Sequence, residues 1–151
     1  MTYLSSHDAQ QQKIFGPFFA TMLLTFVVWV YMYIRRIRFL RSGAINLELV
    51  RRPEDMARLT PPAVSNPSDN LKNLFEIPIL FYAISLYLFV TKQVDAAYVT
   101  AGWLFLVFRI VHSVNQCTIN IIMPRFYCYL CSCLALFFMM LRAMMTHFLS
   151  S

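Results

Sequence analysis

Long runs of hydrophobic residues, separated by polar segments, divide the chain into four expected helices. The first run, residues 14–34, has no charged side chain over 21 residues. As a helix it would measure about 31 Å, which matches a hydrocarbon core of about 30 Å. Three further helices are expected over residues 67–91, 96–119 and 125–148, with links short enough for antiparallel packing. The pattern predicts an all-α integral membrane protein, a single four-helix transmembrane bundle over residues 1–151.

The composition excludes an ordinary soluble protein. Hydrophobic residues make up 59% of the 151 residues and charged residues 13%, whereas a typical soluble domain has about 45–50% and about 25%. A soluble chain of this size has too much surface to hide so much apolar material. Soluble enzymes and disordered tails are therefore excluded, and the lipid bilayer is the expected partner.

Basic residues are concentrated after the first expected span. The net charge is +6, and eight of the 13 lysines and arginines lie in residues 35–73. Basic residues beside a span mark its cytoplasmic side and contact lipid headgroups. The basic loop, residues 35–66, and the turn at residues 120–125 are therefore expected to face the cytoplasm or the mitochondrial matrix, with both termini opposite. The pattern fits a bacterial inner membrane, the endoplasmic reticulum or the mitochondrial inner membrane, and no motif indicates nucleic acid.

Proline and asparagine residues predict where the second helix begins and bends. Asn66 is a good N-cap, Pro67 suits the first helical position, and Asp69 adds an acid to the first turn. The helix is therefore expected to begin near Pro67. Pro78 lacks the N–H of a helical hydrogen bond, so a kink is expected there.

Three of the four cysteines, Cys128, Cys131 and Cys133, form a C-x-x-C-x-C pattern. They lie in an apolar run, and the sequence has no second Cys/His pair at zinc spacing. We interpret them as small residues that pack against neighbouring helices, and we expect no metal site.

Polar and ionisable side chains inside the expected spans are the candidate functional residues, because such groups are costly in a bilayer. On the third helix, Arg109, His112, Gln116 and Asn120 follow i, i+3, i+7 and i+11. Side chains at this spacing share one helical face. The third helix is therefore expected to carry a polar stripe.

A second polar stripe is expected on the second helix, where Asp69, Asn73 and Glu76 follow i, i+4 and i+7. The second helix leaves the basic-loop side and the third returns to it, so both stripes should lie in the same half of the bilayer. We expect Glu76 to approach Arg109 directly or through one water, because neither charge is then isolated in a low dielectric. Such a pair is either a structural staple or part of the lining of a polar, water-accessible pocket.

Three segments carry a family resemblance. Residues 73–82 read N-L-F-E-I-P-I-L-F-Y, residues 108–113 read F-R-I-V-H-S, and residues 117–120 read C-T-I-N. Over residues 14–148 the chain resembles the short bacterial-type branch of the MAPEG family (membrane-associated proteins in eicosanoid and glutathione metabolism). The resemblance implies a trimer of left-handed four-helix bundles that binds glutathione between adjacent subunits, in the cytosolic half of the membrane.

The resemblance also implies roles for particular residues. Asn73 and Glu76 match an N-x-x-E motif that contacts glutathione in the family, and Arg109 is similar in place to an arginine on the family's third helix. The implied glutathione ligands are Asn73, Glu76, Arg109 and Gln116. The implied catalytic residues are Arg109 and His112.

The sequence departs from the family pattern at several of these positions. Asp69 stands where glutathione-binding members have an arginine, and His112 and Gln116 replace two tyrosines. The arginine held to activate the thiol aligns with Met123, two residues from Arg125. Glutathione binding is therefore expected to be weak.

Two functions remain open. The first is a glutathione-dependent transferase or peroxidase, whose thiolate would need a nearby cation to lower its pKa. The second is a non-catalytic structural or accessory subunit of a larger membrane complex, such as a respiratory assembly. The enzyme would form a homotrimer, and the accessory subunit would be part of a larger complex.

Overall fold

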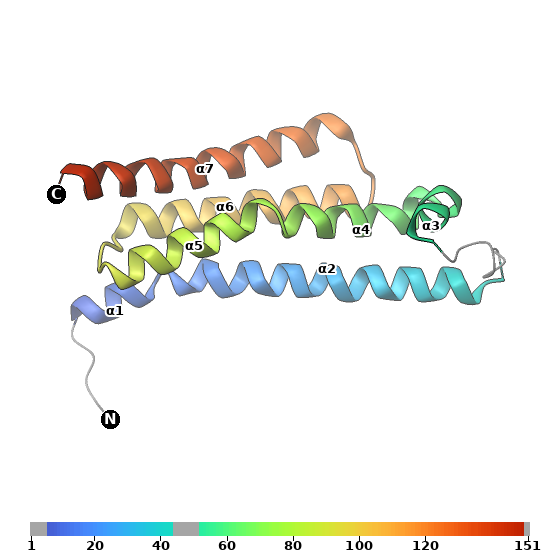
Figure 1. The fold of residues 1–151 in the computed structure, drawn as a ribbon, viewed down its shortest axis with the longest axis horizontal. Helices are drawn as coiled ribbons and strands as arrows, with labels where there is room; N and C mark the ends of the chain where they lie inside the picture. The colour runs from blue at the N-terminus through green and yellow to red at the C-terminus, as the bar shows by residue number, and fades with distance from the viewer. Residues whose placement is uncertain (1–5, 44–51, 150–151) are drawn as a thin grey trace, which may run out of the picture.

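The computed structural model describes residues 6–43 and 52–149, which form seven helices (Figure 1). In chain order they are α1 (Ser6–Gln12), α2 (Phe15–Arg41), α3 (Pro53–Leu59), α4 (Pro62–Leu74), α5 (Ile77–Val90), α6 (Ala96–Cys117) and α7 (Ile122–Leu149). Four stretches are long and apolar enough to span a membrane: Asp8–Arg41, Pro62–Val90, Ala96–Cys117 and Ile122–Leu149. The prediction of an all-α membrane protein with four spans is confirmed.

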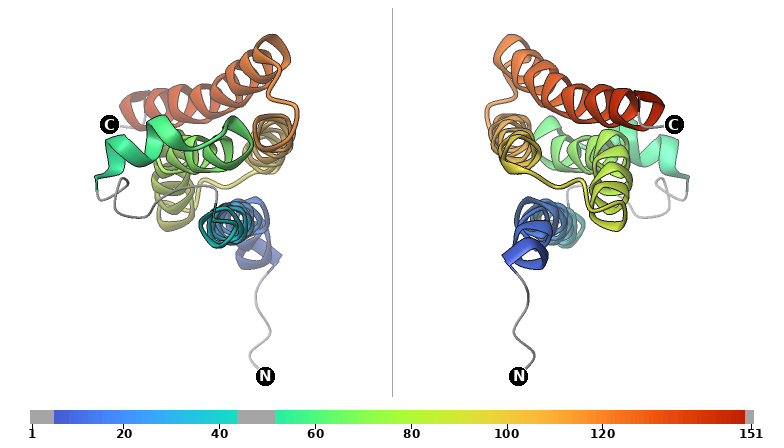
Figure 2. Two further views of the ribbon diagram at one scale, coloured as in Figure 1. Left: turned by 90° about the vertical axis from the view of Figure 1, so that its right-hand side faces the viewer. Right: turned by 90° about the vertical axis from the view of Figure 1, so that its left-hand side faces the viewer.

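Helix α6 lies in the middle of the bundle. It packs most extensively against α7 and also contacts α2 and α4, while α2 and α7 lie on opposite sides of the layer that α6 forms with α4 and α5 (Figure 2). Helix α1 and the end of α7 lie at one end of the bundle, here named the α1 end. Helix α3 and the end of α2 lie at the other, the α3 end (Figure 1). Both ends of the described chain therefore lie at the α1 end, in agreement with the prediction that the termini share one side. The α3 end remains the one predicted to face the cytoplasm.

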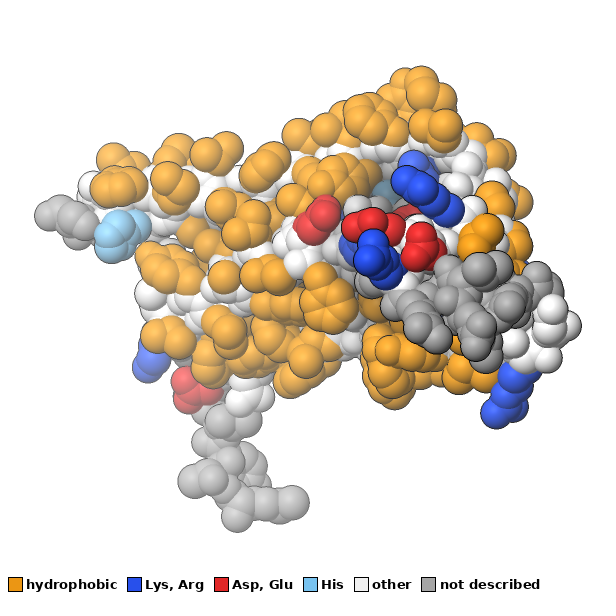
Figure 3. All heavy atoms as spheres, turned by 45° about the vertical axis from the view of Figure 1, so that its right-hand side comes forward, with side chains coloured by type: hydrophobic (Ala, Val, Ile, Leu, Met, Phe, Trp, Pro, Cys, Tyr) orange, Lys and Arg blue, Asp and Glu red, His pale blue; other side chains and the backbone are white. Residues whose placement is uncertain are grey.

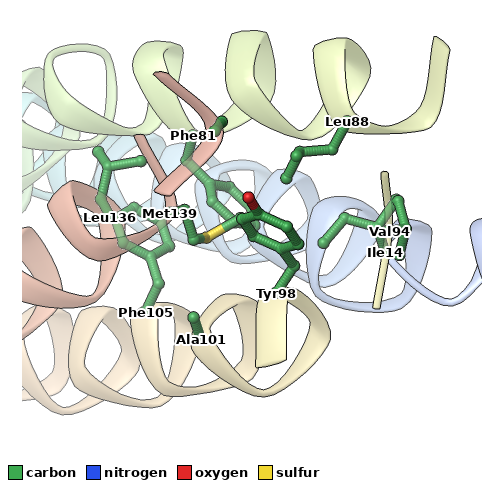
Figure 4. Close-up of a cluster of buried hydrophobic side chains, with 10 residues drawn as sticks. Ile14, Phe81, Leu88, Val94, Tyr98, Ala101, Phe105, Leu136 and Met139 are labelled. Carbon is green, nitrogen blue, oxygen red and sulfur yellow. The ribbon is translucent and has the colours of Figure 1, made fainter. Parts of the chain in front are cut away.

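The core consists of aromatic and aliphatic side chains from α5, α6 and α7. Phe81, Phe105, Leu136 and Met139 are fully buried (Figure 4). The rings of Phe81 and Phe105 stack with their centroids 4.5 Å apart. Large hydrophobic side chains also cover much of the outer surface, as expected where lipid replaces water as the solvent.

A glycine allows α2 to approach α6 closely. A Cβ atom at Gly102 would lie 3.0 Å from Cγ of Pro17 and 3.6 Å from the ring of Phe81. The proline ring cannot move aside, so a larger residue would push the two helices apart. Small residues at such crossings are typical of membrane helix pairs.

The first span is longer than its hydrophobic run predicts. Helix α2 continues from residue 34 to Arg41, and the short helix α3 lies within the loop expected over residues 35–66. The charged residues at the end of α2 have good helix propensity, so the helix continues after the apolar run ends.

The second span begins five residues earlier than predicted. Pro62, rather than Pro67, takes the first helical position, and Pro67 lies inside α4. Because Pro67 has no N–H, the carbonyl of Ala63 lacks its helical donor. Arg35 on α2 fills this role, since its Nε and Nη2 donate to that carbonyl at 3.2 Å and 3.0 Å.

The kink expected at Pro78 is a break between two helices. Helix α4 ends at Leu74 and α5 begins at Ile77, so Phe75 and Glu76 are not helical. Pro78 has no N–H to donate to the carbonyl of Leu74, which explains where the helix is interrupted. Glu76 becomes the N-cap residue of α5, with φ −94° and ψ −89°.

Polar contacts join three elements at the α1 end. Gln11 of α1 donates from Nε2 to the carbonyl of Val94 at 3.2 Å and accepts from its N–H at 2.9 Å. Asp95 caps α6 by accepting from the N–H of Tyr98, and it forms an ion pair with Arg142 of α7. The guanidinium of Arg142 lies 4.4 Å from the ring centroid of Tyr98.

The Asp95–Arg142 pair predicts a specific pH dependence. The hydrogen bond from Arg142 holds the pKa of Asp95 below its ordinary value of 3.8. A lowered folded-state pKa contributes stability above pH 3.8, which is lost as the pH falls through the folded-state pKa. We expect the melting temperatures of the wild type and the Asp95→Asn variant to differ at neutral pH and to converge as the pH falls below the lowered pKa of Asp95. A difference that does not change over this range would contradict the assignment, since asparagine retains the capping group.

Candidate functional site

A ladder of amide and hydroxyl side chains joins α4 to α6 in the half of the bundle nearest the α3 end. Nδ2 of Asn120, in the link after α6, donates to Oδ1 of Asn66 on α4 at 3.1 Å. Asn70, which is fully buried, accepts from the hydroxyl of Ser113 at 3.3 Å. These contacts place the inward-facing polar residues of α4 level with those of α6 along the bundle.

The third rung of the ladder contains residues that the family resemblance selects. Nδ2 of Asn73 lies 3.1 Å from Oε1 of Gln116, and that oxygen lies 2.9 Å from Nε2 of His112. Nδ1 of His112 lies 3.0 Å from the backbone carbonyl of Arg125. We name Asn73, Gln116, His112 and this carbonyl the relay, because each contacts the next.

The relay links the tautomer of His112 to the orientation of Asn73. A neutral imidazole has one N–H, yet both ring nitrogens of His112 face oxygen atoms in this arrangement. Both bonds form with the imidazolium, and a neutral ring that donates from Nε2 keeps the bond to Gln116 and loses the one at Nδ1. With a neutral ring that donates from Nδ1, the side-chain amides of Gln116 and Asn73 must both turn by about 180°. The tautomer of a neutral His112 is therefore linked to whether Asn73 offers an NH₂ group or an oxygen outward.

Arg109 lies beneath the relay and has no exposed surface. Its guanidinium lies 4.9 Å from the ring centroid of Tyr129 and 5.6 Å from that of Phe105. Within the described part of the chain, none of its three side-chain nitrogens has a hydrogen-bond partner. The predicted direct pair between Glu76 and Arg109 is therefore not formed.

The helix break explains why Glu76 does not bond to Arg109. The prediction assumed one continuous helix, in which Glu76 would extend the face that carries Asn73. The break at Phe75 and Glu76 interrupts that face, and Glu76 is exposed. Its charge acts on Arg109 through space, without a hydrogen bond.

Asp69 also lies outside the inward-facing set. It is exposed and pairs with Lys72 at 3.1 Å, both side chains being more than half exposed. The inward-facing residues of α4 are instead Asn66, Asn70 and Asn73, so the expected stripe of Asp69, Asn73 and Glu76 is wrong except at Asn73.

The structure adds several polar residues to the site that the sequence did not select. Asn70 and Ser113 are buried, and Asn70 also donates from Nδ2 to Sγ of Cys117 at 3.4 Å. The signal was available, because Asn66, Asn70 and Asn73 follow the same i, i+4, i+7 spacing that selected the charged stripe. Arg125 is added as well, since its guanidinium donates to Asn120.

Charged side chains gather close to this site. In the space-filling view, acidic and basic groups lie together over α3, α4 and the start of α7, in a surface that is otherwise mostly hydrophobic (Figure 3). Within this region Lys72 and Glu76 are exposed and Arg125 is half-buried. A ligand with charges of both signs would find partners here.

Comparison with known proteins agrees with this architecture. The sequence matches the MAPEG family over residues 14–145, which is most of the chain. The chain belongs to the MAPEG family. No curated protein and no solved structure matches it. Family membership makes it a multi-pass integral membrane protein, and the four spans of the structure agree.

The cysteines of this MAPEG protein are free thiols. Cys133 is buried, and Cys117, Cys128 and Cys131 are half-buried. Within the residues that the structure describes, no three His, Cys, Asp or Glu side chains are grouped in a way that could hold a metal ion.

Proposed function

We propose that this MAPEG protein binds glutathione at the outer end of the relay and uses it as a glutathione-dependent transferase or peroxidase. The observation that carries the proposal is the relay itself: Asn73, Gln116 and His112, which the resemblance selects, lie within hydrogen-bond distance of one another. Family membership supports the choice of glutathione. Bound glutathione would supply the nucleophilic thiol.

The charges around the relay fit a zwitterionic peptide. Glutathione carries an ammonium group and two carboxylates. The exposed Glu76 is the partner for the ammonium, and Lys72 and Arg125 are the cations available to the carboxylates. Asp69 opposes the carboxylates and also occupies Lys72 through its ion pair. The site therefore offers charges of the signs that glutathione needs, and we expect its affinity for glutathione to be low.

The roles of the candidate residues differ with their exposure. Asn73 is half-buried and Glu76 exposed, so these two would contact the ligand. Gln116 and His112 are 4% and 3% exposed, so they would act as positioning residues that set the orientation of Asn73. Arg109 has no exposed surface and would act through its positive charge, which water screens poorly at this depth.

We also propose that the protein forms the trimer typical of the family, with the site near a subunit boundary. The α3 end would then face the cytoplasm, because it follows the basic segment after the first span. A non-catalytic accessory subunit is the second candidate. The ladder favours it, because the amides of α4 already pair with side chains of α6 and of the link after it, and stabilise the bundle without a ligand.

Changing the charge at Asp69 tests the proposal. The Asp69→Arg variant removes the acid and adds a cation, so we expect glutathione to bind about fivefold more tightly than to the wild type, which corresponds to about 1 kcal/mol. Titration calorimetry of the protein in lipid nanodiscs measures this. The Asp69→Asn variant, which only removes the charge, should be intermediate. Absence of glutathione binding in all three proteins would favour the accessory-subunit function.

A further inference from the structure

An apolar groove runs between α6 and α7 in the half of the bundle nearest the α1 end. Its volume is about 650 Å³. Small side chains leave this space: Ala96, Ala97, Thr100 and Ala101 on α6, and Cys131 and Ala135 on α7. The groove lies away from the relay, and the proposed function does not use it.

The length of the groove matches one leaflet of a bilayer. Its lining extends along α6 from Ala96 to Phe108, which at about 1.5 Å per residue is about 18 Å. Half of a hydrocarbon core of about 30 Å is about 15 Å. The groove therefore accommodates one extended acyl chain whose headgroup lies at the α1 end.

An ion pair lies at the headgroup end of the groove. Asp95 directly precedes Ala96, and Arg142 lies one helical turn beyond Phe138, the last lining residue of α7. The side chains of Arg142 and Asp95 are 35% and 44% exposed. The groove is thus apolar along its length, with one half-buried positive and one half-buried negative group near its end.

The ion pair retains capacity for further partners. Arg142 has five N–H donors, and its two bonds to Asp95 use two of them. Asp95 accepts from Arg142 and from the N–H groups of Tyr98 and Ala97, so its carboxylate attracts a further cation through its charge and its half-exposed surface. A phosphate can therefore bind Arg142 while an ammonium group lies beside Asp95.

We propose that this groove is a binding site for one zwitterionic phospholipid of the phosphatidylethanolamine type. One acyl chain lies between α6 and α7, the phosphate contacts Arg142, and the ammonium group contacts Asp95. Charge complementarity selects this occupant over an anionic lipid, because a headgroup without an ammonium leaves Asp95 facing a phosphate. It also selects a lipid over a wholly apolar helix of another chain.

Native mass spectrometry of the full-length protein in mild detergent tests the site. We expect one retained dioleoyl phosphatidylethanolamine per chain, bound about tenfold more tightly than dioleoyl phosphatidylglycerol. The double variant Ala97→Phe/Thr100→Phe fills the groove from two exposed positions and should weaken this binding by about tenfold. The control Val111→Phe/Val114→Phe adds the same rings at the same spacing, beyond the groove. It should bind as the wild type does.

The Arg142→Gln variant tests the contact between Arg142 and the lipid headgroup. Arg142→Gln leaves the groove intact, so phosphatidylethanolamine should still bind while its preference over phosphatidylglycerol falls to about one. Unchanged binding in the groove-filling variant would overturn the proposal, as would equal affinity of the wild type for both lipids. A groove-filling variant that loses subunits rather than lipid would show that a second copy covers the groove, which would also overturn it.

Discussion

Replacing Arg109 by methionine is expected to stabilise the protein by about 1–4 kcal/mol, the range seen when buried charged groups are replaced by well-packed apolar ones. Arg109 is fully buried, and its side-chain nitrogens have no hydrogen-bond partner among the described residues. Methionine has similar length, adapts to irregular space and makes favourable contacts with aromatic rings such as Tyr129. Thermal unfolding in detergent would show the gain as a higher melting temperature.

The same variant should lose glutathione binding. A costly buried charge is retained where its field attracts an anionic ligand. Its removal should therefore raise the melting temperature and weaken glutathione binding. Arg125→Met is the matched comparison for stability alone, because Arg125 donates to Asn120 and its loss should lower the melting temperature. A lower melting temperature for Arg109→Met would contradict this account and would mean that Arg109 has an anionic partner in the assembled protein.

Replacing Phe105 by alanine is expected to have the largest destabilising effect, about 3–5 kcal/mol. Phe105 has no exposed surface, stacks on Phe81 with ring centroids 4.5 Å apart and lies beneath the guanidinium of Arg109. The deletion leaves a cavity between α5 and α6, which neighbouring side chains fill only in part.

The control for this loss is Phe137→Ala. Phe137 is 47% exposed on α7 and meets lipid, so its removal leaves no internal cavity and should change the melting temperature little. Equal losses in the two variants would show that burial in the single chain does not determine stability here. Unfolding in detergent, followed by circular dichroism, provides the comparison.

The four spans could be predicted from the sequence because their signal is local. A run of about 20 apolar residues has few alternatives in a bilayer, and the four spans follow the four hydrophobic runs. The start of α4 could not be predicted in the same way, because proline fits both the first position of a helix and an interior position whose freed carbonyl has another donor. Arg35 provides that donor from a different helix, a contact that local sequence does not show.

Part of the candidate site could also be predicted, where its residues lie on a single helix. The spacing on α6 correctly grouped His112 with Gln116, which the structure joins. The direct pair of Glu76 with Arg109 is not formed, because the break before Pro78 interrupts the face that carries Asn73. Contact through one water stays a prediction. Asn70 does not stand out in the sequence because the acids of α4 give the stronger signal, whereas uncharged amides make the buried contacts.

Glutathione binding to an Asn73 variant tests the central claim most directly. We expect equilibrium dialysis of the protein in lipid nanodiscs to show at least about tenfold weaker binding for Asn73→Leu than for the wild type. Thr118→Leu is the control, because Thr118 is exposed and bonds to its own helix at the carbonyl of Val114. It should bind glutathione as the wild type does. Equal affinity of all three proteins for glutathione would contradict the assignment of the relay as the glutathione site.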